Sequence, residues 1–262
     1  MPQHPRLSSL VSRSAIVAAA TIALPACSFS PINHRVKVGQ ESFIVFVGDG
    51  IDHNVDLFAV PAGGGAVAQV TFTPLIERAP RLSPTGEYLA FLRMRDSLPS
   101  TPRIIVVMNL LGGGEKTLDL PPDAGTPTAL GWARDSVTLY VRTDRGTWSA
   151  SVAPAPAALK AVTPDRAAAA DSVLDIWLGE PRFARVIGCA TGGLCIFGPK
   201  GDTTSLAPLG SEPVRWGTDS VAWFQQGGII VRSLGPGRER RVTWTGGPAN
   251  PREVTYAAGP SS

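Results

Sequence analysis

The side chain with the clearest chemistry in this sequence is the thiol of Cys27. It follows a segment that carries Arg6 and Arg13 but no acidic residue before an apolar run over residues 14–24. A basic start, a short apolar core and a small-residue exit are the features of a secretory signal peptide. The run has about half of the ~20 apolar residues that a membrane-spanning helix needs. We therefore predict a signal peptide over residues 1–26.

The residues around this thiol resemble the lipobox of bacterial lipoproteins. Leu24 stands three positions before the cysteine and Ala26 directly before it, while Pro25 is a less usual residue for the middle position. The resemblance implies a lipid on Cys27 and a membrane anchor. Ser28, which stands where sorting to the inner membrane would favour aspartate, indicates an outer-membrane lipoprotein that faces the periplasm or the cell surface. The alternative is ordinary cleavage nearby, with Cys27 left as a free thiol.

Cys189 and Cys195 flank the stretch Ala190-Thr191-Gly192-Gly193-Leu194. A Gly-Gly centre between two apolar runs is typical of a hairpin turn. Cysteines on facing strands of so short a hairpin can come within disulfide reach, and export exposes them to an oxidising compartment. We predict a Cys189–Cys195 disulfide; two unpaired buried thiols are the alternative.

The charge balance argues against nucleic acid as a partner. Lys and Arg number 24 against 21 Asp and Glu, and removal of the signal segment brings the two still closer. Because no basic run is present and the balance is near neutral, we expect no binding to nucleic acid. The high Gly and Pro content, 28 and 24 residues beside 44% hydrophobic residues, favours a turn-rich β domain with a real core.

From residue 42 onward, short β runs alternate with Gly, Pro, Asp and Ser clusters, and equivalent runs recur about every 35–50 residues, as in propeller blades. We therefore predict an all-β fold, a β-propeller of about five four-stranded blades over residues 42–262, with residues 27–41 as an extended, lipid-anchored linker. Beyond the signal no segment keeps a helical period, and Ala167–Ala170 comes nearest. The last segment, residues 250–256, is expected to return and complete the first blade. The strands expected with most clarity are 43–47, 56–61, 88–92, 104–108, 137–141, 147–152, 185–189, 194–197, 221–224 and 229–233.

The stretch from Pro80 to Phe91, Pro-Arg-Leu-Ser-Pro-Thr-Gly-Glu-Tyr-Leu-Ala-Phe, followed by Ile104–Asn109 and a glycine turn, resembles one TolB-type β-propeller repeat. Leu82 replaces the aromatic residue of that repeat and Thr85 its aspartate. Weaker copies begin at Trp132 and Trp216, so one blade matches the repeat well, two match it partly and two match it only in the spacing of their strands. It implies an envelope protein whose propeller binds other proteins.

Motifs for catalysis are few. The sequence has no Gly-x-Ser-x-Gly elbow and no His-Glu-x-x-His, and only three histidines. The turn around His53 lacks the order of a calcium loop, and Gly112–Thr117 lacks the glycine of a phosphate loop. We expect no metal and no cofactor. Four acids near the starts of inner strands could serve a glycosidase, whose carboxyls must lie about 5 to 9.5 Å apart: Glu77, Asp175, Glu212 and Glu253.

Two further sets of side chains recur at matching places beside the inner strands. Trp132, Trp177 and Trp216 are expected to pack between blades, and a sugar-binding platform is the alternative. Three arginines could ring the mouth of the channel and bind a carboxylate or an acidic peptide, or could be solvated charges at strand ends: Arg81, Arg215 and Arg252.

These observations together predict a monomeric, lipid-anchored envelope propeller that serves as a protein-binding scaffold without catalysis. Rigid blades with variable loops are suited to recognition. The alternative is a carbohydrate-binding or glycoside-cleaving five-bladed propeller.

Overall fold

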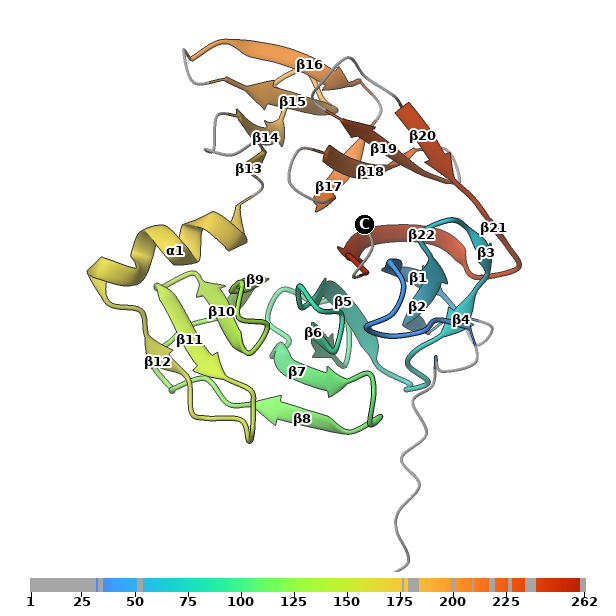
Figure 1. Cartoon of the computed structure of the whole chain (residues 1–262). Helices are drawn as coiled ribbons and strands as arrows, with labels where there is room; N and C mark the ends of the chain where they lie inside the picture. The colour runs from blue at the N-terminus through green and yellow to red at the C-terminus, as the bar shows by residue number, and fades with distance from the viewer. Residues whose placement is uncertain are drawn as a thin grey trace, which may run out of the picture.

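Runs of β-branched and aromatic residues form the strands, which assemble into five antiparallel sheets around a common axis (Figure 1). The computed structural model describes residue 32 and residues 35–50, 54–175, 177–178, 184–198, 201–208, 210–216, 220–225, 228–233 and 239–259. Within these residues the architecture is a five-bladed β-propeller, as the sequence predicts.

Each blade is a four-stranded sheet whose first-named strand is innermost. Blade 1 consists of β22 (Ala249–Ala257), β1 (Phe43–Asp49), β2 (Val55–Pro61) and β4 (Ala68–Gln69), and blade 2 of β5 (Ile76–Leu82), β6 (Tyr88–Met94), β7 (Ile104–Asn109) and β8 (Glu115–Leu118). Blade 3 consists of β9 (Pro127–Trp132), β10 (Thr138–Thr143), β11 (Thr147–Ser151) and β12 (Lys160–Ala161). Blade 4 consists of β13 (Trp177–Leu178), β14 (Ala184–Gly188), β15 (Leu194–Phe197) and β16 (Thr203–Ala207), and blade 5 of β17 (Ser211–Trp216), β18 (Ser220–Gln225), β19 (Gly228–Ser233) and β20 (Glu239–Val242).

The C-terminal strand closes the ring. β22 pairs antiparallel with β1, so that Phe43 lies opposite Ala257 and Asp49 opposite Ala249. A second link is the parallel pair of β3 (Gly65–Ala66) and β21 (Trp244–Thr245). The return of the last segment to blade 1, expected from the sequence, is confirmed.

The pairing defines two ends of the ring. We call the lower face the end where β1 and β6 begin and where β22 and β5 end, as the pairs Phe43–Ala257 and Leu82–Leu89 show. The upper face is the opposite end, where Asp49 ends β1 and Ile76 begins β5.

The segment before β1 is folded onto the lower face. Ile32 and Val36 are fully buried, and they belong to the same apolar cluster as Phe43, Leu110 and Ala257. Backbone turns keep the segment compact, because the N–H groups of residues 35 and 36 donate to the Ile32 carbonyl. The described part of the expected linker is therefore not extended, since its spaced apolar residues find a place in the core. Figure 1 shows it near the end of β22, where the Gly259 N–H donates to Ser42 Oγ at 2.9 Å.

The core is divided among the junctions between blades. Phe43, Val45 and Val47 on one side of β1 face blade 2, and Ile44 and Phe46 on its other side face blade 5. Similar clusters join blades 2 and 3 and blades 4 and 5. A strand buried on both sides is a continuous apolar run, which is why the middle strands were predictable from the sequence.

The junction of blades 3 and 4 is built differently in the described residues. The helix α1 (Pro164–Leu174) lies there, with Thr163 as N-cap and Pro164 at its first turn. It lies so close to β9 that a Cβ on Gly131 would come within 2.7 Å of the Val173 carbonyl oxygen. The sequence did not predict this helix, because most of its side chains are exposed and leave no apolar period. No helix in the described part of the chain is both long and apolar enough to cross a membrane.

The predicted disulfide is present at the upper end of blade 4. Cys189 and Cys195 are bonded, with their Cα atoms 5.2 Å apart, across the turn between β14 and β15. Gly193 has a φ of +78°, and a Cβ there would lie 2.3 Å from the Ala207 carbonyl oxygen, so this turn requires glycine.

Removal of the closing strand should destabilise the whole ring. We expect deletion of residues 249–262 to lower the melting temperature by about 10 °C or more. The strand β1 loses its inner hydrogen-bonded neighbour, and the apolar clusters on both sides of blade 1 lose Ala257 and Val254, a loss on the order of several kcal/mol. Thermal unfolding followed by circular dichroism measures this. Deletion of residues 260–262 alone is the control, and equal melting temperatures for the two truncations would contradict the closure.

Candidate functional site

Strands β22 and β1 of blade 1 and β5 of blade 2 bring four charged side chains together toward the upper face: Asp49, Arg78, Arg252 and Glu253. We call them the charge cluster. Arg252 Nη2 donates to Asp49 Oδ1 at 2.9 Å, and Asn250 Nδ2 donates to Asp49 Oδ2 at 2.7 Å. Arg78 Nη1 donates to Glu253 Oε1 at 3.0 Å. The cluster therefore joins the two inner strands of blade 1, β22 and β1, to the innermost strand of blade 2, β5.

Two bulges aim these side chains. The backbone has positive φ values of +51° at Ala79 in β5 and +49° at Glu253 in β22, where the pairing with the neighbouring strand shifts register. A bulge releases a backbone group from the ladder and redirects a side chain. Here the released Ala79 N–H donates to the Glu253 carboxylate. The backbone N–H released at one bulge is thus bound by the side chain at the other, across the junction of blades 1 and 2.

The cluster carries two positive and two negative charges, which balance. The hydrogen bond from Asn250 and the Arg252 guanidinium hold the pKa of Asp49 below its ordinary value, although partial burial opposes them. Because each arginine already has a carboxylate partner, an incoming acid would have to displace one. The geometry is suited to holding strands together and to exchanging ion pairs with a charged partner.

The three arginines singled out from the sequence lie on innermost strands of consecutive blades. Arg215 is on β17, Arg252 on β22 and Arg81 on β5, and all three are partly buried. Arg252 is in the charge cluster. Arg81 Nη1 donates to the Pro80 carbonyl at 2.8 Å. Their role in binding a ligand stays a prediction.

Glu77 is the centre of a buried network behind the cluster. Its carboxylate is fully buried and accepts from Thr73 Oγ1 at 2.6 Å and from Arg93 Nε at 2.9 Å. Arg93 also donates to Glu115 through Nη1 and Nη2 at 2.8 and 3.1 Å. Burial raises the pKa of Glu77, although the hydrogen bonds from Thr73 and Arg93 oppose the rise. This network joins three strands of blade 2.

The network continues into blade 1 through Asp56, which is nearly buried at the start of β2. Asp56 accepts from Thr71 Oγ1 at 3.3 Å and from Gln69 Nε2 at 3.1 Å. The Thr71 hydroxyl lies 3.4 Å from Glu77 Oε2. Since Thr71 has one hydroxyl proton, it can serve one of the two carboxylates at a time.

The four acids considered for glycoside cleavage do not form an accessible pair among the described side chains. Glu77 is sealed from solvent, Glu253 is bound by Arg78 and the Ala79 N–H, and Asp175 accepts from Arg142 at 3.1 Å. The side chain of Glu212 lies outside the described residues. A glycosidase needs a carboxyl that can reach the substrate, which the buried Glu77 cannot do.

The tryptophans pack between blades, as predicted for them. Trp132 Nε1 donates to the Arg81 carbonyl at 2.8 Å, and its ring stacks on Tyr88. Trp216 stacks on Tyr256 with ring centroids 4.0 Å apart. The side chain of Trp177 lies outside the described residues. His53 and Cys27 also lie outside them, and the described residues contain no group of three side chains suited to hold a metal.

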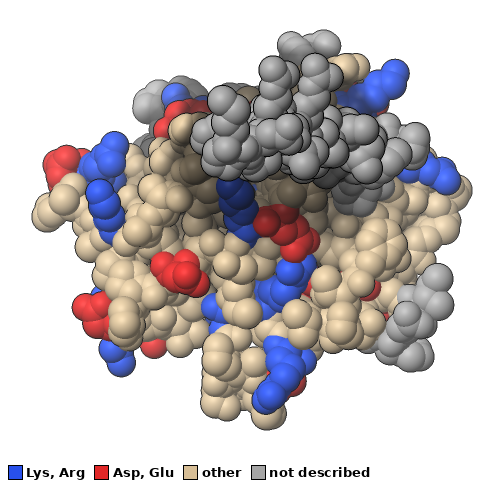
Figure 2. All heavy atoms as spheres, turned by 90° about the horizontal axis from the view of Figure 1, so that it is seen from below, with Lys and Arg blue, Asp and Glu red and all other residues tan. Residues whose placement is uncertain are grey.

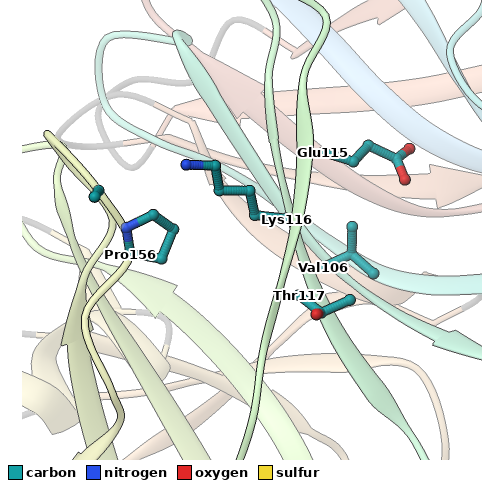
Figure 3. A pocket seen from close by; sticks show the side chains of 6 residues that line it. Val106, Glu115, Lys116, Thr117 and Pro156 are labelled. Carbon is teal, nitrogen blue, oxygen red and sulfur yellow. The ribbon is translucent and has the colours of Figure 1, made fainter.

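A hollow of about 640 Å³ lies on the outer rim between blades 2 and 3, where Lys116 points toward Pro156 (Figure 3). Its lining is mostly exposed, so it would leave a small ligand open to water. Figure 2 shows positive and negative side chains interspersed on one side of the molecule, without a large surface patch of a single charge sign. Neither feature adds a site to the charge cluster.

Sequence reasoning missed Asp49, Arg78 and Arg93. Asp49 and Arg93 each stand within or at the end of an apolar run, which is the available signal for an ion pair inside the fold, whereas Arg78 stands in a mixed segment that gives no such signal. Their partners could not be read from the sequence, because Asp49 and Arg252 are 203 residues apart.

Comparisons with known proteins leave the family open. No protein-family model and no curated protein matches the chain. Among solved structures, the chain is similar to a chain of a nidogen/laminin complex, with a TM-score of 0.47 and 10% identity over 82% of this chain and 98% of that one. A Bacteroides fragilis protein proposed to be a 6-phosphogluconolactonase gives 0.35 and 9% over 79% and 68%. An acylaminoacyl peptidase from Pyrococcus horikoshii gives 0.28 and 14% over 79% and 31%. At these values the likeness carries no argument about function.

Replacement of Glu77 should destabilise the fold. We expect Glu77→Ala to lower the free energy of unfolding by about 3 kcal/mol, because Arg93 loses its buried partner. The matched control is Glu115→Ala, which removes the more exposed partner of the same arginine and should cost about 1 kcal/mol or less. Urea denaturation measures both. Equal losses would show that burial of Glu77 does not matter.

The contribution of the Asp49–Arg252 ion pair to stability should depend on pH. A folded-state pKa below the ordinary 3.8 means that ionised Asp49 stabilises the fold above pH 3.8, and that this stabilisation is lost as the pH falls through the lower folded-state pKa. We expect Asp49→Asn to be less stable than the unmodified protein at pH 7 and the difference to shrink below pH 3.8. Unfolding free energies between pH 7 and 2 test this; a difference that grows in acid would contradict it.

Proposed function

We propose that this protein is a lipid-anchored envelope propeller that binds another protein, with Cys27 as the acylated residue and the outer membrane as its location. The lipobox-like residues before Cys27 support the anchor. The five-bladed ring supplies a rigid platform, and the loops at its ends supply variable surface.

One observation carries the assignment of protein binding. Large apolar side chains are exposed at the upper end of blade 2 and in the connection that leads into it from blade 1. Phe72, in the connection from β4 to β5, is 70% exposed, and Leu98, between β6 and β7, is 64% exposed. Ile104, at the start of β7, is 45% exposed. Apolar side chains gathered at one end of a soluble domain are typical of protein interfaces.

The loop that carries Leu98 is fixed in shape. Asp96 Oδ1 accepts from the Leu98 N–H at 3.0 Å and from the Thr101 hydroxyl, and the Thr101 N–H donates to the Leu98 carbonyl at 3.0 Å. The hydrogen bonds from Thr101 and the Leu98 N–H hold the pKa of Asp96 below its ordinary value. A side chain presented by an ordered loop loses less entropy when a partner binds.

Catalysis is not part of this proposal. Of the candidate acids, those with described side chains are all held in ion pairs, and Glu77 cannot reach a substrate. The carbohydrate alternative would be favoured by release of sugar products from envelope polysaccharide, or by Trp fluorescence changes on addition of oligosaccharides.

The intact mass of protein extracted from membranes tests the anchor. We expect a chain that begins at Cys27 and carries two or three acyl chains, with no alkylation until the Cys189–Cys195 disulfide is reduced. An unacylated chain, or one that begins elsewhere, would make the protein freely secreted.

Site-specific loss of a cross-linked product tests the binding surface. After cross-linking in cells, we expect Phe72→Ser and Leu98→Ser each to abolish a product that Leu111→Ser retains, because Leu111 is an exposed leucine at the opposite face. A product that survives both upper-face substitutions would contradict the proposal.

A further inference from the structure

The chain between the acylated cysteine and the folded domain is very short. Ile32 is already fully buried in the core between blades 1 and 2. From Cys27 to Ile32 there are five Cα–Cα steps, which span about 18 Å at most when fully extended. A domain fixed to a lipid by such a tether must touch or nearly touch the membrane.

The tether meets the domain at the lower face. The segment that contains Ile32 and Val36 leads directly into Phe43, the lower end of β1. The same cluster holds Leu110, which follows the lower end of β7 and whose N–H donates to the Glu87 carbonyl at 2.8 Å. The point of attachment is therefore between the lower ends of blades 1 and 2.

The height of the ring exceeds the reach of the tether. β1 and β6 each have seven residues, which corresponds to about 23 Å from the lower to the upper face. To bring the upper face onto the membrane, the tether would have to run around the edge of a blade, farther than about 18 Å.

We propose that the lower face rests on the lipid surface, so that the upper face, with the charge cluster and the exposed residues Phe72 and Leu98, points away from the membrane toward the partner. The proposal rests on acylation of Cys27 in the proposed function. It adds an orientation: one named face is given to lipid and the opposite one to protein.

The chemistry of the lower face suits a headgroup layer. Arg35 and Lys37 are exposed directly after the point of attachment, and Leu111 is 50% exposed in the turn that follows buried Leu110. Glu41, whose carboxylate accepts from the Lys37 N–H at 2.6 Å, and Glu87 lie at the same end. Because these acids offset the basic residues, the tether and the apolar turn hold the face in place more than net charge does.

Quenching of labels on the two faces tests the orientation. The acylated, disulfide-bonded protein is labelled with a fluorophore at Leu111→Cys or at Leu98→Cys, which are both exposed leucines in turns, and inserted into phosphatidylethanolamine–phosphatidylglycerol vesicles that carry nitroxide headgroups. We expect quenching to be several-fold stronger at position 111 than at position 98. A spacer of about twenty Gly and Ser residues inserted after Phe29 should reduce the difference, because its root-mean-square length is about 25 Å.

The two ways of failing are distinguishable by mass. Equal quenching at both positions, or stronger quenching at position 98, in protein whose mass includes acyl chains would overturn the orientation while the anchor stands. Protein from the same membranes without acyl chains would overturn the anchor itself, and the orientation with it.

Discussion

In the described residues, blades 1, 2 and 5 each have two apolar faces and can cover neither by themselves. In β1, alternate side chains enter different clusters, with Phe43 and Val45 toward blade 2 and Ile44 and Phe46 toward blade 5. Such a sheet is stable only between two neighbours, so the blades must form a ring and the ring must close. Hydrogen bonds also cross two of the junctions: the Leu82 N–H donates to Thr255 Oγ1 between blades 1 and 2, and Trp132 Nε1 donates to the Arg81 carbonyl between blades 2 and 3. The charge cluster lies at the junction of blades 1 and 2, where the first strand of the ring, β1, pairs with β22.

The middle strands could be predicted from the sequence because burial on both sides leaves uninterrupted apolar runs such as Phe43–Val47. The inner strands were harder to recognise, since β5 carries Glu77, Arg78 and Arg81 among its apolar residues. Arg78 is paired with Glu253 of blade 1, and Glu77 with Arg93 of the neighbouring strand β6, and a single strand cannot reveal such partners. The disulfide was accessible because its turn is local, only six residues long in sequence separation.

Two departures from expectation have physical causes. The helix α1 has hardly any buried side chains, so the periodic signal that identifies helices is missing, and its alanine content and Pro164 are all that indicate it. The segment before β1 looked like a tether because it is short and polar in part. Its apolar residues, Ile32, Val36 and Val38, are spaced too irregularly to suggest a strand, yet each finds a place in the cluster between blades 1 and 2.

The closure of blade 1 by β22 also sets the order in which the protein can be made. Strand β1 is made first among the described strands, but its inner neighbour β22 is about two hundred residues away and is made after all of them. Until then β1 has an unpaired edge and an uncovered face, which are features that promote association with other chains. Contacts between such distant residues also form slowly. The complete sheet of blade 1 must therefore wait until β22 has been made, and a chain that lacks this strand keeps the inner edge of β1 unpaired.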